Sequence, residues 1–385
     1  MKKTLSIACA MAVPLLFSQS ATAAFDYFKK SDDGFKRFSV SAGWLHAKPT
    51  GDATPVRNTT AIKEGTDAKN GSITAGEVKE VIDRNQSADA LEKVDLVFGY
   101  GDKPGLISPD TDLSNVKFPL PLGNVSGNTV INGLGSFATP GTGLESDTVD
   151  TLGMLLTYYV DDHWGVEVKA GIPPTVDILG KGEVIAPFSG RVTPGEAAES
   201  LTGSFDIKKD IKITDMTQGG GVASSARAWL PAALVQYQFG KQGVNKFRPY
   251  IGAGVMYAYF DDIELNPGIG RDLQIAAGRL QLIQDGKAGA ALGSKEAVRD
   301  NIDAKVADMR VKVEADSAWA PIINVGATYD FDENWFAVGS ISYAKLDSDT
   351  TITVKNQETG KQLIEAKSNI DIDPYITYLG VGYRF

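Results

Sequence analysis

The chain has 385 residues, a formal net charge of −10 and one cysteine, Cys9. The acidic balance argues against a nucleic-acid partner, and a single thiol excludes a disulfide framework or a thiolate metal site. No segment after residue 24 is apolar over the roughly 18 residues that a membrane-spanning helix needs. No cofactor motif is recognisable, so we expect neither a cofactor nor a metal.

Residues 1–24 predict a secretory signal peptide. Lys2 and Lys3 precede a mostly apolar run at residues 5–17, and the segment Ala21-Thr22-Ala23 fits a cleavage site between small residues. Cys9 lies inside this run, so the mature chain is expected to have no thiol. We expect one exported domain over residues 25–385.

Eight later segments alternate between apolar and polar residues with the period of two that is typical of β-strands. Each is about as long as a tilted strand that crosses a bilayer, or slightly longer. The predicted strands are residues 37–48, 151–160, 165–176, 230–239, 248–260, 318–330, 336–345 and 375–385.

Short and long connections alternate strictly between these segments. The short ones are residues 161–164, 240–247 and 331–335. The long ones are residues 49–150, 177–229 and 261–317, followed by a hairpin over 346–374. This asymmetry is typical of outer-membrane barrels, which have short periplasmic turns and long outer loops.

Aromatic residues gather at both ends of the predicted strands, as the two membrane interfaces favour. Within the loops, apolar residues recur at helical spacing over 75–94 and 295–310, which predicts short helices. These helices would either line a funnel for a ligand or form a solvated cap. The carboxylates of residues 261–268 do not have the pattern of a calcium loop.

The sequence therefore predicts an all-β fold: an eight-stranded antiparallel transmembrane β-barrel with long extracellular loops that contain short helices. In the last strand, Leu379, Val381, Tyr383 and Phe385 have the parity that faces lipid. This C-terminal pattern resembles the signal that such barrels present to the barrel assembly machinery.

Strand parity also assigns the lumen. Glu167, Gln238, Arg248 and Arg384 lie toward the periplasmic ends, and we expect a hydrogen-bonded polar plug there because unpaired charge in a narrow barrel is costly. Leu155, Leu234, Tyr250 and Met256 lie further out and form either an apolar pocket or a simple packed filling. The complete predicted lining is Leu155, Tyr159, Lys169, Leu234, Tyr250, Met256, Ser342 and Tyr378.

Pro173 and Pro174 interrupt the third strand near its outer end. Neither proline can donate to a strand ladder. The pair marks either a lateral opening in the wall or an ordinary strand end before a loop.

Several blocks of the sequence resemble the OmpW family of small outer-membrane barrels. They are FSVSAGWLHAKPTG (38–51), TLGMLLTYYVDDHWGVEVKAGIP (151–173), LPAALVQYQFG (230–240), KFRPYIGAGVMYAYFDD (246–262) and DIDPYITYLGVGYRF (371–385). The resemblance covers the strands and not the loops, which are longer here. It implies passage of small hydrophobic molecules through an apolar lumen and a lateral opening, the latter at Pro173 and Pro174.

We expect this passive passage to be the function, in the outer membrane of a Gram-negative cell. The alternative is a surface structural or receptor protein whose loops act in adhesion or in docking of a bacteriocin or phage. Expected partners are outer-membrane lipid and lipopolysaccharide, the barrel assembly machinery and small hydrophobic solutes. An enzyme is not expected, because no Ser or acid accompanies His46 or His163 in a recognisable motif.

Overall fold

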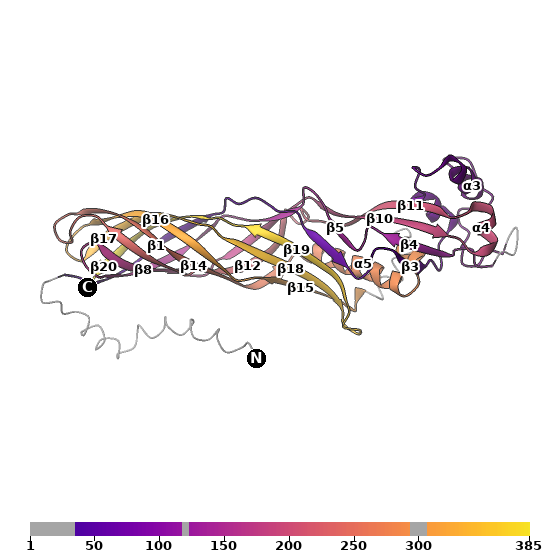
Figure 1. Cartoon of the computed structure of the whole chain (residues 1–385). Helices are drawn as coiled ribbons and strands as arrows, with labels where there is room; N and C mark the ends of the chain where they lie inside the picture. The colour runs from indigo at the N-terminus through magenta and orange to yellow at the C-terminus, as the bar shows by residue number, and fades with distance from the viewer. Residues whose placement is uncertain (1–34, 118–122, 293–305) are drawn as a thin grey trace.

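The computed structural model describes residues 35–117, 123–292 and 306–385. The molecule is elongated, with a barrel at one end, a β extension that continues it, and a distal lobe with helices at the other end (Figure 1). The predicted signal peptide lies outside the described residues, and so does most of the segment 295–310. None of the helices within the described ranges is long and apolar enough to span a membrane.

Eight antiparallel strands form a closed barrel in the circular order β13-β8-β7-β1-β20-β17-β16-β14, with β13 pairing back to β14. All eight predicted strands are present in the predicted chain order, so the predicted fold class is confirmed. The strands are β1 (Phe38–Lys48), β7 (Val149–Tyr159), β8 (Trp164–Gly171), β13 (Ala232–Gln238), β14 (Phe247–Leu265), β16 (Ala318–Asp330), β17 (Trp335–Ala344) and β20 (Tyr375–Arg384).

The outward side chains of the barrel are apolar. In β20, Leu379, Val381 and Tyr383 are exposed, and the Phe385 ring stacks on Phe38 with 6.2 Å between centroids. Most of the large apolar side chains exposed in the described residues lie on the barrel strands and their short turns. A contiguous apolar belt of this extent indicates a surface in contact with lipid rather than with water.

Aromatic contacts form a belt at each end of the barrel wall. The belt beside the short turns contains the pairs Phe38–Tyr158, Trp164–Tyr237, Tyr329–Phe331 and Trp335–Tyr383. The belt at the other end contains the pairs Trp44–His46, Tyr257–Trp319 and Tyr343–Tyr375. Two such belts are the arrangement expected at the two membrane interfaces.

Two of the short turns share one construction. Asp161 Oδ1 accepts the backbone N–H groups of His163 and Trp164, and Asp332 Oδ1 accepts those of Asn334 and Trp335, each at 2.7 Å. These turns satisfy their own backbone donors. The N–H groups of Trp164 and then His163 hold the pKa of Asp161 below its usual value, and those of Trp335 and then Asn334 do the same for Asp332.

The predicted long loops form further β-structure. In the extension, one sheet continues the barrel through β14 and another lies beside it. The first comprises β6 (Gly143–Ser146), β9 (Thr175–Lys181) and β12 (Val222–Trp229), and the second β2 (Arg57–Thr60), β5 (Ser136–Ala138), β15 (Met309–Ala315), β18 (Asp347–Asn356) and β19 (Gln362–Asp371).

The distal lobe has a four-stranded sheet and several helices. Its strands are β3 (Thr66–Lys69), β4 (Asn128–Asn132), β10 (Glu183–Thr193) and β11 (Phe205–Asp215). The helices are α2 (Ala75–Val81), α3 (Ala88–Phe98) and α4 (Glu196–Thr202), with α5 (Pro267–Gln284) and α6 (Ala288–Leu292) leading back to the extension. Short helices thus occupy the predicted 75–94 region, where Thr74 and Glu77 form a capping box at the start of α2.

Helix α5 was not predicted. It begins with Asn266 as N-cap and Pro267 in the first turn, a known start signal, and buries Ile269, Leu273 and Ala277 in the largest apolar core. This core also includes the inner faces of β10 and β19. Two smaller apolar clusters lie inside the barrel.

A lipid-facing and a water-facing leucine provide a test of the membrane boundary. Leu379 on β20 is 54% exposed, and Leu106 in the distal lobe is 59% exposed. We expect Leu379→Arg to destabilise the protein by about 2–4 kcal/mol in liposomes because the charge faces the middle of the bilayer. The control Leu106→Arg should change the stability by less than about 0.5 kcal/mol. Urea unfolding of both variants measures this, and equal losses would contradict the assignment.

Candidate functional site

A buried polar layer closes the lumen near the short turns. The Arg384 guanidinium donates to Asp330 Oδ1 at 2.6 Å and to Thr328 Oγ1 at 3.3 Å. Gln238 Nε2 donates to the same Thr328 oxygen at 2.9 Å and to the Arg248 carbonyl at 3.4 Å. The layer therefore connects β13, β14, β16 and β20 across the lumen.

Both arginines in this layer are almost fully buried. The Arg248 guanidinium donates to the carbonyls of Asp162 and Gly240 in two of the short turns. The Arg384 guanidinium lies 4.4 Å from the centroid of the Phe336 ring, a cation–π contact. Three of the four residues assigned to the plug from the sequence thus lie together; Glu167 is the exception.

Glu167 belongs to a second polar layer. Its Oε1 lies 3.5 Å from Lys169 Nζ, which donates to Ser342 Oγ at 3.0 Å. Ser342 Oγ donates in turn to Asn324 Oδ1 at 2.9 Å. Lys169, which parity assigned to the lining of a pocket, therefore compensates the buried Glu167 charge, and Ser342, assigned to the same lining, accepts a hydrogen bond from Lys169.

A small polar cavity of about 10 Å³ lies between these layers, lined by residues that include Tyr159 and Gln236. Four side-chain atoms of its lining have no protein hydrogen-bond partner: Oε1 of Glu167, Gln236 and Gln238, and the Tyr250 hydroxyl. A volume of that size holds about one water molecule, which needs two to four polar partners. The polar half of the lumen is therefore filled and is not an open channel.

Leu155, Tyr159 and Tyr250, which parity assigned to the lining, border this small cavity and are otherwise closely packed. Leu155, Tyr250 and Tyr378 contact Phe336 and Val338 in one apolar cluster. The Tyr378 hydroxyl is 3.0 Å from Ser41 Oγ, and the Tyr159 hydroxyl is 3.5 Å from Ser39 Oγ. Gly326 makes room for the Tyr250 ring, because a methyl group there would lie 2.6 Å from ring carbon Cζ.

Leu234 and Met256 belong to the second cluster, further out, where they contact small side chains such as Ala258 and Ala320. Both are 2% exposed. Of the two alternatives for Leu155, Leu234, Tyr250 and Met256, the burial of all four favours a packed filling, and Leu155 and Tyr250 border only the cavity of about 10 Å³. Alanines and rings fill this level, so the two leucines, the methionine and Tyr250 form part of a packed barrel interior.

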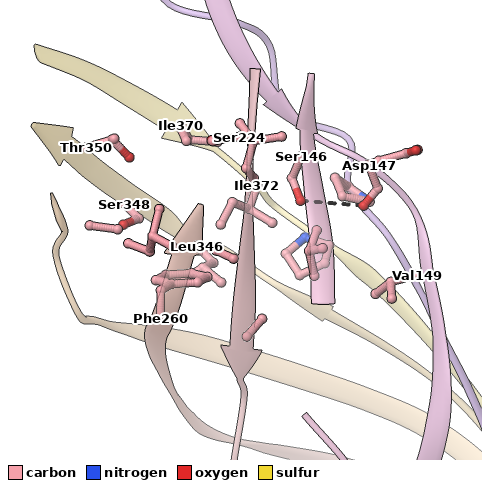
Figure 2. Close-up of a pocket in the computed structure, with 18 of the residues that line it drawn as sticks. Ser146, Asp147, Val149, Ser224, Phe260, Leu346, Ser348, Thr350, Ile370 and Ile372 are labelled. Atoms are coloured by element: carbon pink, nitrogen blue, oxygen red, sulfur yellow. Dashed lines mark hydrogen bonds between the residues drawn. The ribbon is translucent and has the colours of Figure 1, made fainter. Parts of the chain in front are cut away.

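A separate, apolar cavity lies beyond that packed level, at the base of the extension. We call it the chamber; its volume is about 60 Å³. Figure 2 shows side chains from several strands around it, among them Val149, Phe260 and Ile372. Its other lining residues are Ala47, Pro49, Ser146, Asp147, Val176, Ile178, Ser224, Ala226, Ala228, Leu230, Ile263, Val313, Ala315, Leu346, Ser348, Thr350, Ile370 and Pro374.

The barrel wall is interrupted beside the chamber. β8 pairs with β13 as far as Lys169 opposite Ala232, and β9 pairs with β12 from Thr175 opposite Arg227 outward. We call residues 170–174 and 228–231, which lie between these two ladders, the proline seam. At its outer edge, the Ala228 N–H donates to the Pro174 carbonyl at 3.0 Å.

Three prolines account for the interruption. Pro173 and Pro174 follow β8, and Pro231 precedes β13 on the facing chain. None has an N–H to donate, so the ladder cannot continue through them. Ala228 and Leu230, on either side of Trp229, line the chamber. The chamber and the seam therefore adjoin each other.

Sequence reasoning singled out Pro173 and Pro174, but neither Pro231 nor the chamber. The chamber residues belong mainly to segments that were predicted as loops, where no strand pattern was recognised. A usable signal was present at the end of β12 and just after it, where Ala226, Ala228 and Leu230 alternate with Arg227 and Trp229.

The closed strand circuit, the apolar belt and the sorted turns define an outer-membrane β-barrel. The sequence profile of the OmpW family matches residues 122–286 and 294–385, well over half of the chain. The chain therefore belongs to the OmpW family and is a protein of the outer membrane. The short turns are then at the periplasmic side, and the extension and distal lobe are outside.

The similarity to individual proteins is low. Outer membrane protein W of Vibrio cholerae is 27% identical over 155 residues, which are 40% of this chain and 51% of that protein. The dibenzothiophene metabolism operon protein DoxH of a Pseudomonas strain is 23% identical over 273 residues, which are 71% of this chain and 85% of that protein. The crystal structure of OprG from Pseudomonas aeruginosa aligns with a TM-score of 0.44 and 14% identity, over 91% of this chain and 96% of that one.

The Arg384–Asp330 pair gives a test of the inner polar layer. The Arg384 side chain is 1% exposed and that of Asp330 is 10% exposed. We expect Asp330→Ala to cost about 3–5 kcal/mol, because it leaves a buried guanidinium without its carboxylate. Adding Arg384→Met to this variant should recover most of the loss. Urea midpoints in lipid measure both variants, and equal losses would show that the charge pair is not the cause.

Proposed function

We propose that this protein passes small hydrophobic molecules across the outer membrane, through the chamber and sideways out of the wall. The observation that carries the proposal is the position of an apolar chamber beside the proline seam and above a filled lumen. A solute in the chamber would meet two buried ionic layers on the straight path to the periplasm. The sideways path meets the interrupted wall instead.

The energetic argument favours the side exit. An apolar solute that entered the Glu167 or Arg384 layers would have to separate paired charges in a low-dielectric interior, which costs several kcal/mol. The solute would gain nothing there in exchange. At the proline seam, the outer neighbours Ile172 and Trp229 are exposed on the outside of the wall. Transfer from the chamber to that surface keeps an apolar molecule in apolar surroundings throughout.

The chamber must widen during passage. Its volume of about 60 Å³ is below the roughly 150 Å³ of a dry protein cavity that admits benzene. The Phe260 side chain and the proline seam belong to its boundary and can move without breaking a continuous strand ladder. The relatives named for a dibenzothiophene metabolism operon support a hydrophobic cargo, since that compound is an apolar aromatic.

A receptor role is the second candidate, and one observation favours it. The distal lobe packs around the largest apolar core, which it shares with the extension, and lies well beyond the membrane part of the barrel (Figure 1). Such a lobe presents a folded surface that passage alone does not require. Removal of phage or bacteriocin sensitivity by surface changes in the lobe, with unchanged solute flux, would support this role.

The remaining assignments are also proposals. We propose export by a cleaved signal peptide, assembly through Leu379, Val381, Tyr383 and Phe385, and contact with lipid and lipopolysaccharide. We also propose that the chain is not an enzyme. His46 Nδ1 lies 2.9 Å from Asp150 Oδ1, and its ring stacks on Trp44 at the outer aromatic belt. This is an arrangement suited to anchoring at an interface.

Restoring backbone donors at the seam tests the exit. We expect Pro173→Ala with Pro174→Ala to let β8 and β9 form one continuous strand, and to reduce the flux of a small apolar probe into proteoliposomes several-fold. The control is Pro321→Ala, a proline of β16 that faces away from the lumen and does not line the chamber.

Flux of a polar solute of similar size should stay at the level of empty liposomes for all variants. A double variant with normal flux would reject the side exit. Absence of apolar flux in the folded parent protein would reject passage itself and direct attention to the distal lobe.

A further inference from the structure

The outer end of the extension is filled, which raises the question of how a solute reaches the chamber from outside. Helix α5 lies against β15, β18 and β19, and its Leu280 and Leu282 are buried in the largest apolar core. Val354 of β18 and Leu363 of β19 belong to the same core. A path down the axis of the molecule would have to pass through this packed core, so access through a side wall is the simpler arrangement.

One place in the side wall has two strand edges that face each other without a ladder. The pairing of β14 with β16 ends at Ala258 opposite Ala318. Beyond it, β14 continues to Leu265 and pairs only on its other edge, with β12. β15 is the end strand of its own sheet and pairs with β18. We call the junction of β14 and β15 the outer seam; no backbone hydrogen bond crosses it within the described residues.

The matching junction on the other side of the extension is closed. There, residues 49–56 run between β6 and β19 and bond to both sides. Ala53 forms a β-bridge with Ile370, and Thr54 Oγ1 donates to the Asn369 carbonyl at 2.6 Å. The Val56 N–H donates to Thr142 Oγ1, close to β6, at 3.2 Å. The outer seam differs because no backbone hydrogen bond joins β14 to β15 among the residues that the structure describes; a side-chain bond, from Gln274 Nε2 of α5 to the Met309 carbonyl of β15 at 2.8 Å, lies beside the groove.

An open groove of about 510 Å³ lies outside the outer seam. Ile263 of β14 and Val313 of β15 line both this groove and the chamber. These two side chains therefore form the partition between the two spaces. Rotation of either side chain would join a small apolar chamber to a much larger open groove.

β14 is irregular at this point. Asp262 has a φ of 52°, an uncommon conformation for a residue other than glycine, and the register with β12 shifts between Ser225 and Arg227. The Arg227 guanidinium holds the Asp262 carboxylate at 2.5 Å. Such a bulge bends a strand and re-aims its neighbours, and bulges are common beside functional sites. Here the bend lies next to Ile263.

The groove differs from the chamber in polarity. Asn266, Gln274 and Gln357 contribute polar groups, and its charged lining residues in the described part of the chain are Arg271 and Arg310. No carboxylate lines it there, although the whole chain has a net charge of −10. A molecule with an anionic head and an apolar body matches a groove that presents the exposed Arg310 guanidinium and leads to an apolar chamber.

We propose that the outer seam is the entrance of the transport path, and that it takes apolar molecules with a negatively charged head group. The Arg310 side of the groove holds the head group, while the apolar body passes between Ile263 and Val313 into the chamber. The proposal rests on the proposed function, because an entrance has meaning only if the barrel passes solutes. It adds a location for access and a chemical class of cargo.

A reversible cross-link tests the location. In a Cys9→Ser background, Ile263→Cys and Val313→Cys are joined with a short thiol-specific cross-linker and later released with a reductant. Dodecanoate flux into proteoliposomes should fall several-fold on cross-linking and recover on reduction. The control pair is Thr351→Cys with Lys367→Cys, which joins opposed residues of β18 and β19 that are already in one ladder and do not line the chamber. Its flux should not respond.

An arginine substitution tests the class of cargo. Arg310→Gln should raise the half-saturating concentration of dodecanoate about two- to fivefold, as expected of one exposed ionic contact. The same variant should leave the half-saturation of neutral dodecanol unchanged. Lys312→Gln is the control, because Lys312 lies two residues away on β15, pairs with Glu314 at 2.6 Å and does not line the groove.

The outcomes separate the two levels of the proposal. Loss of flux on cross-linking the outer seam, with an unresponsive control pair, supports the entrance. Unchanged flux in the cross-linked protein overturns the entrance and leaves passage intact. Equal effects of Arg310→Gln on dodecanoate and dodecanol overturn the anionic class. If the folded parent passes neither probe, the proposed function itself fails.

Discussion

The structure depends on one constraint: in contact with lipid, every backbone N–H and C=O must be bonded within the protein. Pairing of β1 with β20 and of β13 with β14 meets it by closing the sheet on itself. Alternation of side chains along each strand then places one set toward lipid and the other in the lumen. A narrow lumen has to be filled, and the chain fills it with rings opposite glycines, with alanines and with paired charges.

The same constraint explains why the proline seam is informative. Three prolines lie at about the same level of the wall, where the membrane part of the barrel meets the extension, and none of them can donate a ladder hydrogen bond. Backbone that is not bonded in a ladder is tolerated where it borders water or a cavity and is costly in pure hydrocarbon. The chamber on the inside and the extension above supply that tolerant setting.

The barrel could be predicted because each of its strands shows, within its own sequence, the alternation of lipid-facing apolar residues with lumen-facing residues. β20 alternates Leu379, Val381 and Tyr383 with lumen residues, and this pattern depends on lipid rather than on the identity of the neighbouring strand. The extension lacks such a signal. β2 has four residues, and its register is set by β19, some 300 positions later in the chain. Parity likewise gave the direction of Leu234 and Met256, but it could not reveal that alanines from β14 and β16 close the space around them. The chamber was beyond prediction because its lining comes from many such segments.

The extension places two breaks in the wall at different distances from the membrane. The proline seam adjoins the lipid-facing strands, whereas the outer seam lies beyond the last pairing of β14 with β16. The chamber touches both, through Ala228 and Leu230 on one side and through Ile263 and Val313 on the other. In a barrel without the extension, a solute on the proposed path would have to enter from water and leave to lipid at the same rim. In the proposed path, the separation of the two breaks would let the polar groove face water while the exit faces the bilayer. The filled axis at both ends fits this proposal, because an open axis would bypass the chamber.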